Sequence, residues 1–568
     1  MMTKKHWITR SVNQEQVLAL AEAMEVSPIT AKVLWGRGVR DSGHARQWLS
    51  NGGGSGHDPF LLPDMEKCVD RLERAIRQKE RICFYGDYDV DGISATSLHL
   101  SFFRSLGAHA EVYIPHRQEE GYGLNERAIR KLADCQVSLM LTADCGTTSH
   151  QEIALAQRLG IDVIVTDHHQ FQDDVPQPFA FINPYRSDNL YPFQGLCSGG
   201  LAYKVIHAYF KKYGGRDVVP EDGLDLVALS SVADVMPLRD ENRVFVREGL
   251  RHINEGRRCG IRALKQVLGI AGSCSASTIG FRLAPVINAA GRLAHAELGV
   301  RLLTSGSDEE ALSLAQKLEH MNRQRREIEQ EIFEEAKACV EEARESPVIV
   351  VGKPGWHVGV VGIVASRLVE RYHRPAVVVA FDQDGMGKGS ARSVPGYNVF
   401  DSLAQCQEHL LAFGGHPAAA GVTVSFDSFS RFQQKMFEVA TGNMTSELKI
   451  PVLDIDAEIN LSEVQPRLLK EFDALDPFGM GNPEPTLSAL GVTVLEKRIV
   501  GDNHLKLVVR HNGSVPIECI GFRMGEWLPT LNGAGRQYDV AFIPEINRWK
   551  GYDRIQLRMR DLRICEGT

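Results

Sequence analysis

The chain has 568 residues, too many for one hydrophobic core, so we expect about three or four domains. Its 43% hydrophobic and 24% charged residues are ordinary for a soluble protein, and no apolar run is long enough to span a bilayer. The 11 cysteines form no C-x-x-C pair, which argues against zinc ribbons and a disulfide framework. The scattered cysteines, together with the lack of an apolar export segment near the N-terminus, predict a cytoplasmic protein. The formal net charge of −8 is weak evidence against a nucleic-acid binder, because one basic groove can coexist with an acidic remainder.

The patterns along the chain predict an α/β protein with a β-rich C-terminal part. The first residues look helical and end in a glycine-rich linker at 51–56. Apolar runs then alternate with helical patterns, which indicates βαβ units and a parallel sheet. The predicted parts are a helical segment and linker (1–56), a first α/β domain (57–305), a long connecting helix (306–346), a second α/β domain (347–445) and a small barrel or sandwich (446–568).

The long helix and the C-terminal part rest on two further patterns. Residues 308–346 contain no Gly or Pro, and apolar residues recur there at three-residue steps, as on one helical face. After residue 450 the apolar runs are short and have no helical partners, which is typical of a small β-barrel or sandwich.

Four stretches place acidic or imidazole groups where a parallel strand is expected to end. They are 87–92 (DYDVDG), 144–146 (DCG), 167–169 (DHH) and 233–235 (ADV). The first three directly follow apolar runs of the kind that buried parallel strands show, and open α/β sheets bind ligands at the carboxyl ends of their strands. Gathered carboxylates would repel one another unless cations lay between them. The pattern therefore predicts a centre for a pair of divalent cations.

The first stretch has two simpler interpretations. Asp87-x-Asp89-x-Asp91-Gly92 opens like an EF-hand calcium loop, but the twelfth position is Leu98 where that loop needs glutamate, and an apolar run rather than a helix precedes it. A solvated turn suits Asp and Gly but does not explain the three other stretches. Oxygen ligands with one or two imidazoles suit Mn²⁺ or Mg²⁺ better than zinc. Two such ions about 3.5–4 Å apart are the arrangement used for phosphoryl displacement, with a shared carboxylate such as Asp144 between them.

These motifs, in this order, resemble the DHH phosphoesterase superfamily, and within it the RecJ single-strand exonucleases. The resemblance covers nearly the whole chain. It rests on 84–92 (FYGDYDVDG), 231–238 (SVADVMPL), 284–293 (APVINAAGRL), 355–368 (GWHVGVVGIVASRL), 387–393 (GKGSARS), 414–421 (GGHPAAAG) and 477–483 (PFGMGNP). It implies that 57–305 is a DHH catalytic domain, 347–445 a DHHA1-type accessory domain and 446–568 an OB-like DNA-binding domain.

The resemblance also implies roles for residues of the acidic stretches. The implied metal ligands are Asp89, Asp91, Asp144, His168 and Asp234, with Asp87 as a further member of the first motif. Asp144, His168 and His169 are the implied catalytic residues, with His169 orienting its neighbour or contacting the scissile phosphate. The chain departs from the family at Val286, where arginine is usual, and at Ala294-His295, where aspartate is common. Both departures leave the proposed ligands intact.

A pocket for a terminal phosphate is expected in the second domain. A terminal phosphate carries charge that an internal phosphodiester lacks, so hydrogen-bond donors can select it. Ser390 and Arg392 are the first candidates, because glycine beside them permits close backbone approach and a serine hydroxyl and a guanidinium both donate. Further candidates for phosphate binding are Arg117, Arg292 and His416, and His357 is a candidate for contact with DNA.

The C-terminal part is expected to bind single-stranded DNA. OB-folds bind single strands through a basic groove and stacked aromatic rings. The richest basic and aromatic cluster of this region comprises Arg548, Trp549, Lys550, Tyr552 and Arg554. A plain exposed hairpin with a packed tryptophan is the alternative interpretation.

The resemblance implies a 5′-to-3′ exonuclease that hydrolyses single-stranded DNA to 5′-mononucleotides in DNA repair and recombination, using two Mn²⁺ or Mg²⁺ ions. The resemblance implies a single-strand-binding protein and a helicase as partners. It does not imply association with a membrane. Three alternatives have features that separate them from this interpretation. A small-substrate DHH phosphodiesterase would not need the C-terminal domain, an inactive DNA-binding scaffold need not keep its ligands, and an inorganic pyrophosphatase is shorter.

Overall fold

The structure is a computed structural model that describes residues 5–49, 56–171, 175–214, 222–342, 346–531, 536–549 and 552–565. It forms two compact units, Gly54–Lys449 and the pair of segments Met1–Gly53 and Ile450–Thr568. Residues 51–55 of the predicted linker at 51–56 lie outside the described residues, as does Lys550, and only the backbone of Arg548, Trp549 and Tyr552 is described. No helix within the described ranges is both long and apolar enough to cross a membrane.

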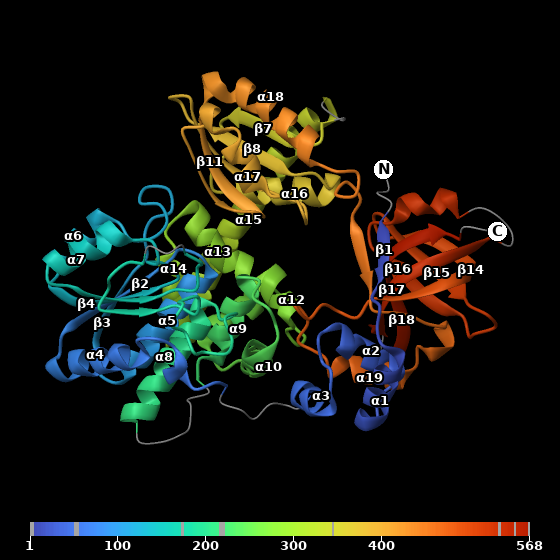
Figure 1. Ribbon diagram of the computed structural model, residues 1–568, viewed down its shortest axis with the longest axis horizontal. Coiled ribbons are helices and arrows are strands. Elements are labelled where there is room, and N and C mark those ends of the chain that lie inside the picture. Colours follow the sequence, from blue (N-terminus) through green and yellow to red (C-terminus); the bar gives the residue numbers. More distant parts are fainter. Residues whose placement is uncertain are drawn as a thin grey trace. The chain divides into compact units, whose positions relative to one another are not determined.

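The first α/β domain contains the predicted parallel sheet (Figure 1). Its five strands lie in the order β3-β2-β4-β5-β6, and every neighbouring pair is parallel. The strands are β2 (Arg81–Gly86), β3 (His109–Tyr113), β4 (Val137–Ala143), β5 (Asp162–Thr166) and β6 (Ala180–Ile182). Three of the four acidic stretches thus follow neighbouring strands, β2, β4 and β5, as the sequence predicts.

Helices cover both faces of this sheet because successive side chains of a strand point to opposite faces. Ile82 and Phe84 pack into a core with α4, α5 and α8, whereas Cys83 and Tyr85 pack with α6 and α7 on the other face (Figure 1). The bounds of these helices are α4 (Met65–Gln78), α5 (Val90–Ser105), α6 (Glu126–Asp134), α7 (His150–Arg158) and α8 (Ser198–Tyr213). A sheet buried on both faces explains why its strands read as unbroken apolar runs.

Helices complete the first domain, and the end of one of them carries Asp234, which the sequence predicts at the end of a strand. Asp234 does not follow a strand: it is the C-cap of α9 (Leu224–Ala233), so the fourth acidic stretch reaches the site from a helix end. The mostly apolar pattern before it fits a buried helix as well as a strand. The remaining helices are α10 (Asp240–Glu255), α11 (Cys259–Val267), α12 (Ala276–Thr278), a π-helical turn (Ile279–Leu283), α13 (Ala284–Leu293) and α14 (Glu297–Thr304).

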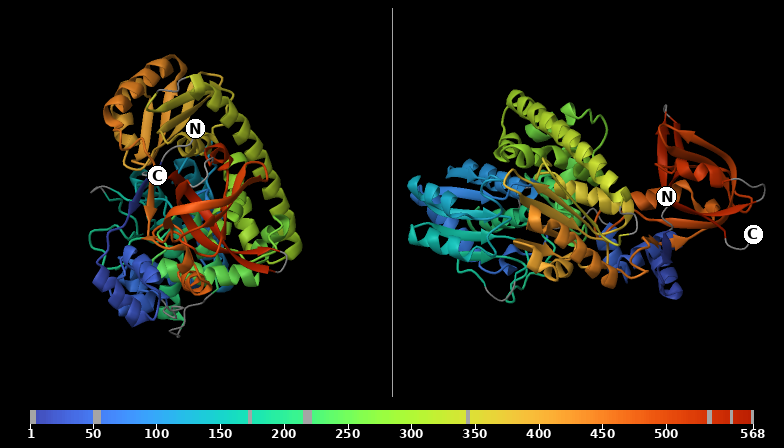
Figure 2. Two further views of the ribbon diagram at one scale, coloured as in Figure 1. Left: turned by 90° about the vertical axis from the view of Figure 1, so that its right-hand side faces the viewer. Right: turned by 90° about the horizontal axis from the view of Figure 1, so that it is seen from above.

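The predicted long helix is α15 (Asp308–Glu342), which Figure 2 shows as a long yellow-green helix running from the first domain into the second. Its N-terminal half packs in the core of the first domain through Leu314 and Leu318. Its C-terminal half packs through Phe333 and Ala336 against the sheet of the second domain. One helix therefore carries residues of two hydrophobic cores.

The second α/β domain has a five-stranded sheet in the order β10-β11-β9-β8-β7, in which only β7 and β8 are parallel. Helix α16 packs with α15 on one face, and α17 and α18 cover the other. The elements are β7 (Ile349–Pro354), α16 (Val361–Tyr372), β8 (Ala376–Phe381), β9 (Met386–Arg392), α17 (Val399–Ala404), β10 (Ala412–His416), β11 (Ala419–Ser425) and α18 (Phe426–Asn443).

The other unit is a closed β-barrel joined by the N-terminal helices. The barrel strands lie in the order β13-β14-β15-β16-β18-β17, and β14 also pairs with β17, which closes the barrel. They are β13 (Ala457–Glu458), β14 (Leu487–Val500), β15 (His504–Arg510), β16 (Ile517–Gly521), β17 (Gln537–Trp549) and β18 (Tyr552–Ile564), with α19 (Pro466–Asp473) between β13 and β14.

The N-terminal segment shares this unit, which the sequence analysis did not predict. Leu34 and Trp48 belong to the same hydrophobic core as Leu505 and Leu557 of the barrel. A short parallel pair of strands, β1 (His6–Thr9) with β12 (Val452–Ile455), adds backbone hydrogen bonds between the N-terminal segment and the segment that precedes the barrel. The helices concerned are α1 (Gln14–Met24), α2 (Pro28–Gly36) and α3 (Ser42–Leu49).

Candidate active site

The first acidic stretch forms the turn between β2 and α5. Asp89 is the N-cap of α5, and its carboxylate accepts hydrogen bonds from the backbone N–H of Asp91 at 2.8 Å and of Gly92 at 3.3 Å. Gly92 is needed here because a Cβ atom would lie 2.5 Å from the backbone nitrogen of Asp87. The turn is therefore tight enough to bring three carboxylates of one short segment to the edge of the sheet.

Asp91 is held by groups that the sequence analysis did not identify. Its two carboxylate oxygens accept hydrogen bonds from the backbone N–H of Ser198 and Gly199, each at 2.9 Å, and from the hydroxyl of Ser230. Ser198 and Gly199 open α8, whose N-terminal dipole favours a carboxylate. The N-cap of α8 is Cys197, which is not among the residue types that mark a helix start, so the sequence gives no signal for this role.

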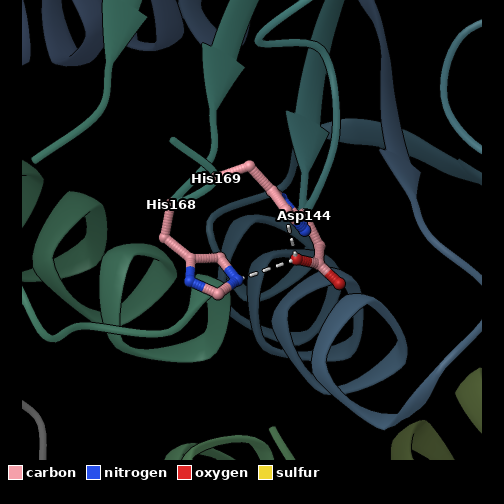
Figure 3. Close-up of side chains that lie close together, drawn as sticks. All are labelled: Asp144, His168 and His169. Atoms are coloured by element: carbon pink, nitrogen blue, oxygen red, sulfur yellow. Dashed lines mark hydrogen bonds and ion pairs between the residues drawn. The ribbon is translucent and has the colours of Figure 1, made fainter. Parts of the chain in front are cut away.

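His168 is the residue at which three carboxylates meet. Its Nε2 atom lies 3.1 Å from Asp144 Oδ1, 3.4 Å from Asp91 Oδ2 and 3.5 Å from Asp234 Oδ2. Figure 3 shows His168 and His169 both turned toward the carboxylate of Asp144. The structure thus brings together side chains from the turns after β2, β4 and β5 and from the end of α9.

The predicted ligands form three overlapping sets of possible metal donors. Within each set the donor atoms lie within 4.8 Å of one another, and the sets are Asp144 with His168 and His169, Asp91 with His168 and Asp234, and Asp87 with Asp89 and Asp144. Asp144 belongs to two of the three sets. Its position between neighbouring sets is what the proposed bridging carboxylate requires.

Several carboxylates of this cluster are buried and close together, which disfavours their ionised form. Burial, followed by the charge of neighbouring carboxylates, raises the pKa of Asp87, Asp89 and Asp144. The same two causes, burial and then Asp91, raise the pKa of Asp234 to about 7. Asp87 Oδ1 is buried without a hydrogen-bond partner in the described part of the chain. Divalent cations would relieve this repulsion and give that oxygen a partner, so the donor set fits Mn²⁺ or Mg²⁺.

For two other groups of the cluster, Asp91 and His168, the pKa shift favours the charged form. Burial, the largest single cause, would raise the pKa of Asp91, but the hydrogen bond with His168, the charge of His168 and the hydrogen bonds from Ser230 and Gly199 together hold that pKa below its ordinary value. Correspondingly, burial would lower the pKa of the His168 imidazole, but its hydrogen bonds with Asp144 and Asp91 and the charges of these carboxylates together raise it well above its usual range. A positive charge is thus favoured at this point of the cluster.

His169 has a different environment from His168. Its Nδ1 atom lies 2.7 Å from Asp167 Oδ1 and 3.9 Å from Asp144 Oδ1. Asp167 also accepts a hydrogen bond from the backbone N–H of Thr147. Burial would raise the pKa of Asp167, but its hydrogen bond with His169, the charges of His169 and His168 and the hydrogen bond with Thr147 together lower it to about 2. Asp167 therefore fixes the orientation of His169, which keeps 39% of its side chain exposed beside the cluster.

The raised pKa of Asp234 predicts how pH changes the stability of metal-free protein. The group prefers its proton in the folded chain up to about pH 7 but releases it near pH 3.8 when unperturbed, so unfolding releases a proton between these values. Stability conferred by this group is present at low pH and is lost as pH rises through about 7. In chelator, the Asp234→Asn variant should gain melting temperature over the parent chain as pH rises from about 5 to about 8. A constant difference across that range, measured by thermal unfolding, would contradict the assignment.

A cavity of about 730 Å³ lies between the two α/β domains. It adjoins the first acidic stretch, because the guanidinium of Arg117 in its wall lies 4.7 Å from the ring centre of Tyr88. Arg117 and Arg292 come from the first domain, and Ser390 and Arg392 from β9 of the second. The first turn of α16 also lines it, and Gly362 there allows close approach, since a Cβ atom would lie 3.1 Å from Arg392 Nη2. A helix N-terminus beside guanidinium groups is suited to bind an anion.

The three arginines of the cavity lie near one another. Burial, and then the charge of Arg117, lowers the pKa of Arg292 to about 10 and also lowers that of Arg392. None of the three forms an ion pair with a carboxylate within the described ranges, although Asp382 lines the same cavity. Arg292 Nη1 donates to the backbone oxygen of Gly359 at 2.9 Å, which joins the two domains at this point. A phosphate group would supply the missing negative charge.

The structure places the other predicted residues as follows. His357, expected to contact DNA, lines the cavity, and its Nδ1 accepts a hydrogen bond from the N–H of Gly359. His416 is exposed at the end of β10 and does not line the cavity, so the structure does not bring it to the predicted phosphate pocket. Arg548 and Trp549 end β17, Tyr552 begins β18, and Arg554 is exposed on β18, so the predicted basic and aromatic cluster flanks a hairpin turn of the barrel. Val286 is buried in the core.

Comparisons with known proteins agree with this architecture. The chain matches the family models described as DHH family, N-terminal domain (residues 81–230), DHHA1 domain (345–442) and RecJ OB domain (455–561). It is 36% identical to the single-stranded-DNA-specific exonuclease RecJ of Bacillus subtilis, over 100% of this chain and 72% of that protein. The equivalent exonuclease of Escherichia coli is 35% identical, over 94% of this chain and 95% of that protein.

A solved structure shows the same fold. RecJ of Thermus thermophilus in complex with Mn²⁺ superposes with a TM-score of 0.84 at 29% identity, covering 98% of this chain and 79% of that one. The predicted fold class is confirmed: a parallel-sheet DHH domain, a long helix, a DHHA1 domain and a C-terminal OB domain. The chain belongs to the RecJ family of single-stranded-DNA-specific exonucleases.

Proposed function

We propose that this chain is a metal-dependent exonuclease that removes 5′-mononucleotides from the 5′ end of single-stranded DNA in repair and recombination. The single observation that carries the proposal is the meeting of Asp91, Asp144 and Asp234 around His168, beside a cavity lined by three arginines. Its relatives are single-stranded-DNA-specific exonucleases, and RecJ of Thermus thermophilus has been solved with Mn²⁺ and with Mg²⁺.

The proposed metal residues are Asp89, Asp91, Asp144, His168 and Asp234, with Asp87 in the same cluster. When bound, two divalent cations would supply a nucleophilic water at neutral pH and charge neutralisation at the scissile phosphate. The chain's own groups keep the ligands in place: α8 and Ser230 hold Asp91, and Asp167 orients His169 toward the substrate side of the cluster. His169 can then donate a hydrogen bond to the scissile phosphate.

The 5′ polarity would follow from the cavity. A terminal phosphate held by Arg392, Ser390, Arg117 and Arg292 places the next phosphodiester at the acidic cluster, so cleavage releases one nucleotide at a time. Arg392 Nη1 already donates to Ser390 Oγ at 2.7 Å, which orients both groups before the phosphate arrives. An internal phosphate lacks the extra charge and would bind more weakly.

In this proposal, residues 57–305 form the catalytic domain, residues 347–445 bind the 5′ end of the DNA, and residues 446–568 bind the rest of the single-stranded DNA. An OB barrel commonly binds single strands by stacking and backbone contacts, so we expect little sequence preference and weaker binding as salt rises. Action in the cytoplasm, with a single-strand-binding protein and a helicase as partners, belongs to the proposal through family resemblance alone.

One digestion series tests the proposal. Single-stranded and blunt double-stranded DNA, each labelled at the 5′ or the 3′ end, are incubated with and without Mn²⁺. We expect labelled mononucleotide to appear at once from the 5′-labelled single strand, late from the 3′-labelled strand, and only with the metal. Early release from the 3′ label, or equal digestion of the duplex, would refute the proposal.

A further inference from the structure

The cavity between the two α/β domains is larger than one phosphate group needs. Its volume of about 730 Å³ lies within the range of about 300–1,000 Å³ that is typical of cavities holding a whole small-molecule ligand. The terminal phosphate proposed above would contact Arg392 and Ser390. The lining continues from there to Lys388, Met386 and Asp382, for which the proposed function has no role.

Lys388, Ser390 and Arg392 form a row of hydrogen-bond donors along β9. Alternate residues of a strand point to the same face, and all three of these residues line the cavity. The row is about 13 Å long, since each residue of a strand adds about 3.3 Å. Small residues of the neighbouring strands, Ala380 opposite Lys388 and Gly421 opposite Ser390, also line the cavity and leave space above the row.

One end of this row is enclosed and the other opens to solvent. Arg392 and Ser390 are half-buried beside the first turn of α16, where a Cβ atom at Gly362 would lie 3.1 Å from Arg392 Nη2 and 3.2 Å from Ser390 Oγ. Lys388 is exposed, as is Met386 with 38% of its surface. A group longer than one phosphate could therefore extend from Ser390 toward Lys388 without meeting a closed wall.

The cavity also carries more positive charge than a terminal monophosphate neutralises. Four cationic side chains line it, those of Arg117, Arg292, Lys388 and Arg392. A phosphate monoester carries only about −1.5 to −2 charges at neutral pH. The carboxylate of Asp382 lies in the same lining, but its Oδ1 already accepts hydrogen bonds from the backbone N–H groups of Asp384 at 3.0 Å and Met386 at 2.8 Å. Lys388 forms no ion pair within the described ranges, so its charge is free to meet further phosphate groups.

From this cavity we propose that the chain also accepts single strands whose 5′ nucleotide carries a triphosphate, with the outer two phosphates lying between Ser390 and Lys388. The inference rests on the proposed function and extends its substrate class. A polymerase leaves such an end when it starts a strand without a primer, because the first nucleotide keeps its triphosphate. Strand initiation is therefore the class of reaction that supplies this substrate.

Cleavage of such a strand releases a different first product. Water adds to the phosphorus of the phosphodiester between the first two nucleotides, and the bond from that phosphorus to the 3′ oxygen of the first nucleotide breaks. The 3′ oxygen receives a proton from the water. The first nucleotide therefore leaves as a nucleoside 5′-triphosphate, and the shortened strand retains the attacked phosphate as a 5′-monophosphate. Every later cycle releases a mononucleotide.

The test uses the full chain with Mn²⁺ and single-stranded DNA of one sequence, carrying either a 5′-triphosphate or a 5′-monophosphate. The measurements are kcat/KM for release of the first nucleotide and the identity of that product by mass spectrometry. The parent chain should cleave the triphosphate strand at least as fast as the monophosphate strand and release a nucleoside triphosphate from it. Lys388→Ala should lower the ratio of the two kcat/KM values, triphosphate over monophosphate, by about tenfold, the lower end of what a hydrogen bond to a charged group contributes.

A second lysine of the same domain provides the control. Lys435→Ala, on α18 and outside the cavity, should leave the ratio unchanged, and melting curves show whether each variant is folded. If the parent chain releases no nucleoside triphosphate, or cleaves the triphosphate strand more slowly than the monophosphate strand, the inference is overturned. An unchanged ratio in Lys388→Ala overturns it as well. If the parent chain releases no nucleotide from the monophosphate strand either, the proposed function fails, and this inference with it.

Discussion

The Asp144→Asn variant is expected to lose nuclease activity by at least about a thousandfold, because metal-centred charge stabilisation contributes several kcal/mol. Asp144 contributes to two of the three donor sets, so one amide weakens both halves of the centre. Asparagine is the better replacement than alanine, since residue 144 has φ +70°, a conformation that asparagine tolerates. Release of mononucleotide in Mn²⁺ measures the effect.

The same variant separates a lost ligand from a lost fold. Because burial and Asp91 raise the pKa of Asp144, its ionised form disfavours the folded metal-free chain at neutral pH. In chelator, Asp144→Asn should therefore melt at the same temperature as the parent chain or higher. The control Asp134→Asn, at the exposed end of α6, should keep full activity. Undiminished Mn²⁺-dependent cleavage by Asp144→Asn would refute the assignment.

The second large loss of activity is expected from a change in the proposed binding site for the 5′ end of the DNA. Arg392→Ala should reduce kcat/KM for 5′-phosphorylated single strands by about ten- to a hundredfold, because hydrogen bonds to charged groups contribute about 1.5–3 kcal/mol. Strands with a 5′-hydroxyl lack the group that Arg392 would bind, so their cleavage should change little. The preference for a 5′-phosphate is the quantity to measure, as the ratio of the two values of kcat/KM.

An arginine elsewhere in the same domain provides the control. Arg431 is exposed on α18 and does not line the cavity, so Arg431→Ala should keep the preference for a 5′-phosphate. If Arg392→Ala slows both substrates by the same factor, Arg392 acts on the fold or on the strand in general. The cavity would then not be the site that recognises the 5′ end.

Much of the fold could be predicted because the periodicity of burial is visible in the sequence. Strands buried on both faces require unbroken apolar runs, so β2, β4 and β5 and the turns that follow them could be located. The long helix could be predicted because its segment lacks Gly and Pro. Asp234 is expected after a strand because α9 is buried along most of its length, and its few polar residues do not leave one apolar face opposite a polar one.

The contacts that hold the site together could not be predicted, because they join residues distant in sequence. Ser198 and Ser230 reach Asp91 only once α8 and α9 pack against α5. Tyr122 reaches Asp144 through the fold of a loop, and a single tyrosine between glycines has no distinctive sequence signal. The packing of the N-terminal helices into the core of the C-terminal barrel likewise depends on residues more than four hundred positions apart.

The most direct test of the account is a calorimetric titration of metal-free protein with Mn²⁺. The parent chain is predicted to take up about two ions, since phosphoryl displacement at such a centre uses a pair, and Asp144→Asn is predicted to bind fewer or far more weakly. Absence of Mn²⁺ uptake by the parent chain, or unchanged uptake by the variant, would contradict the claim that these carboxylates and His168 form a two-metal centre.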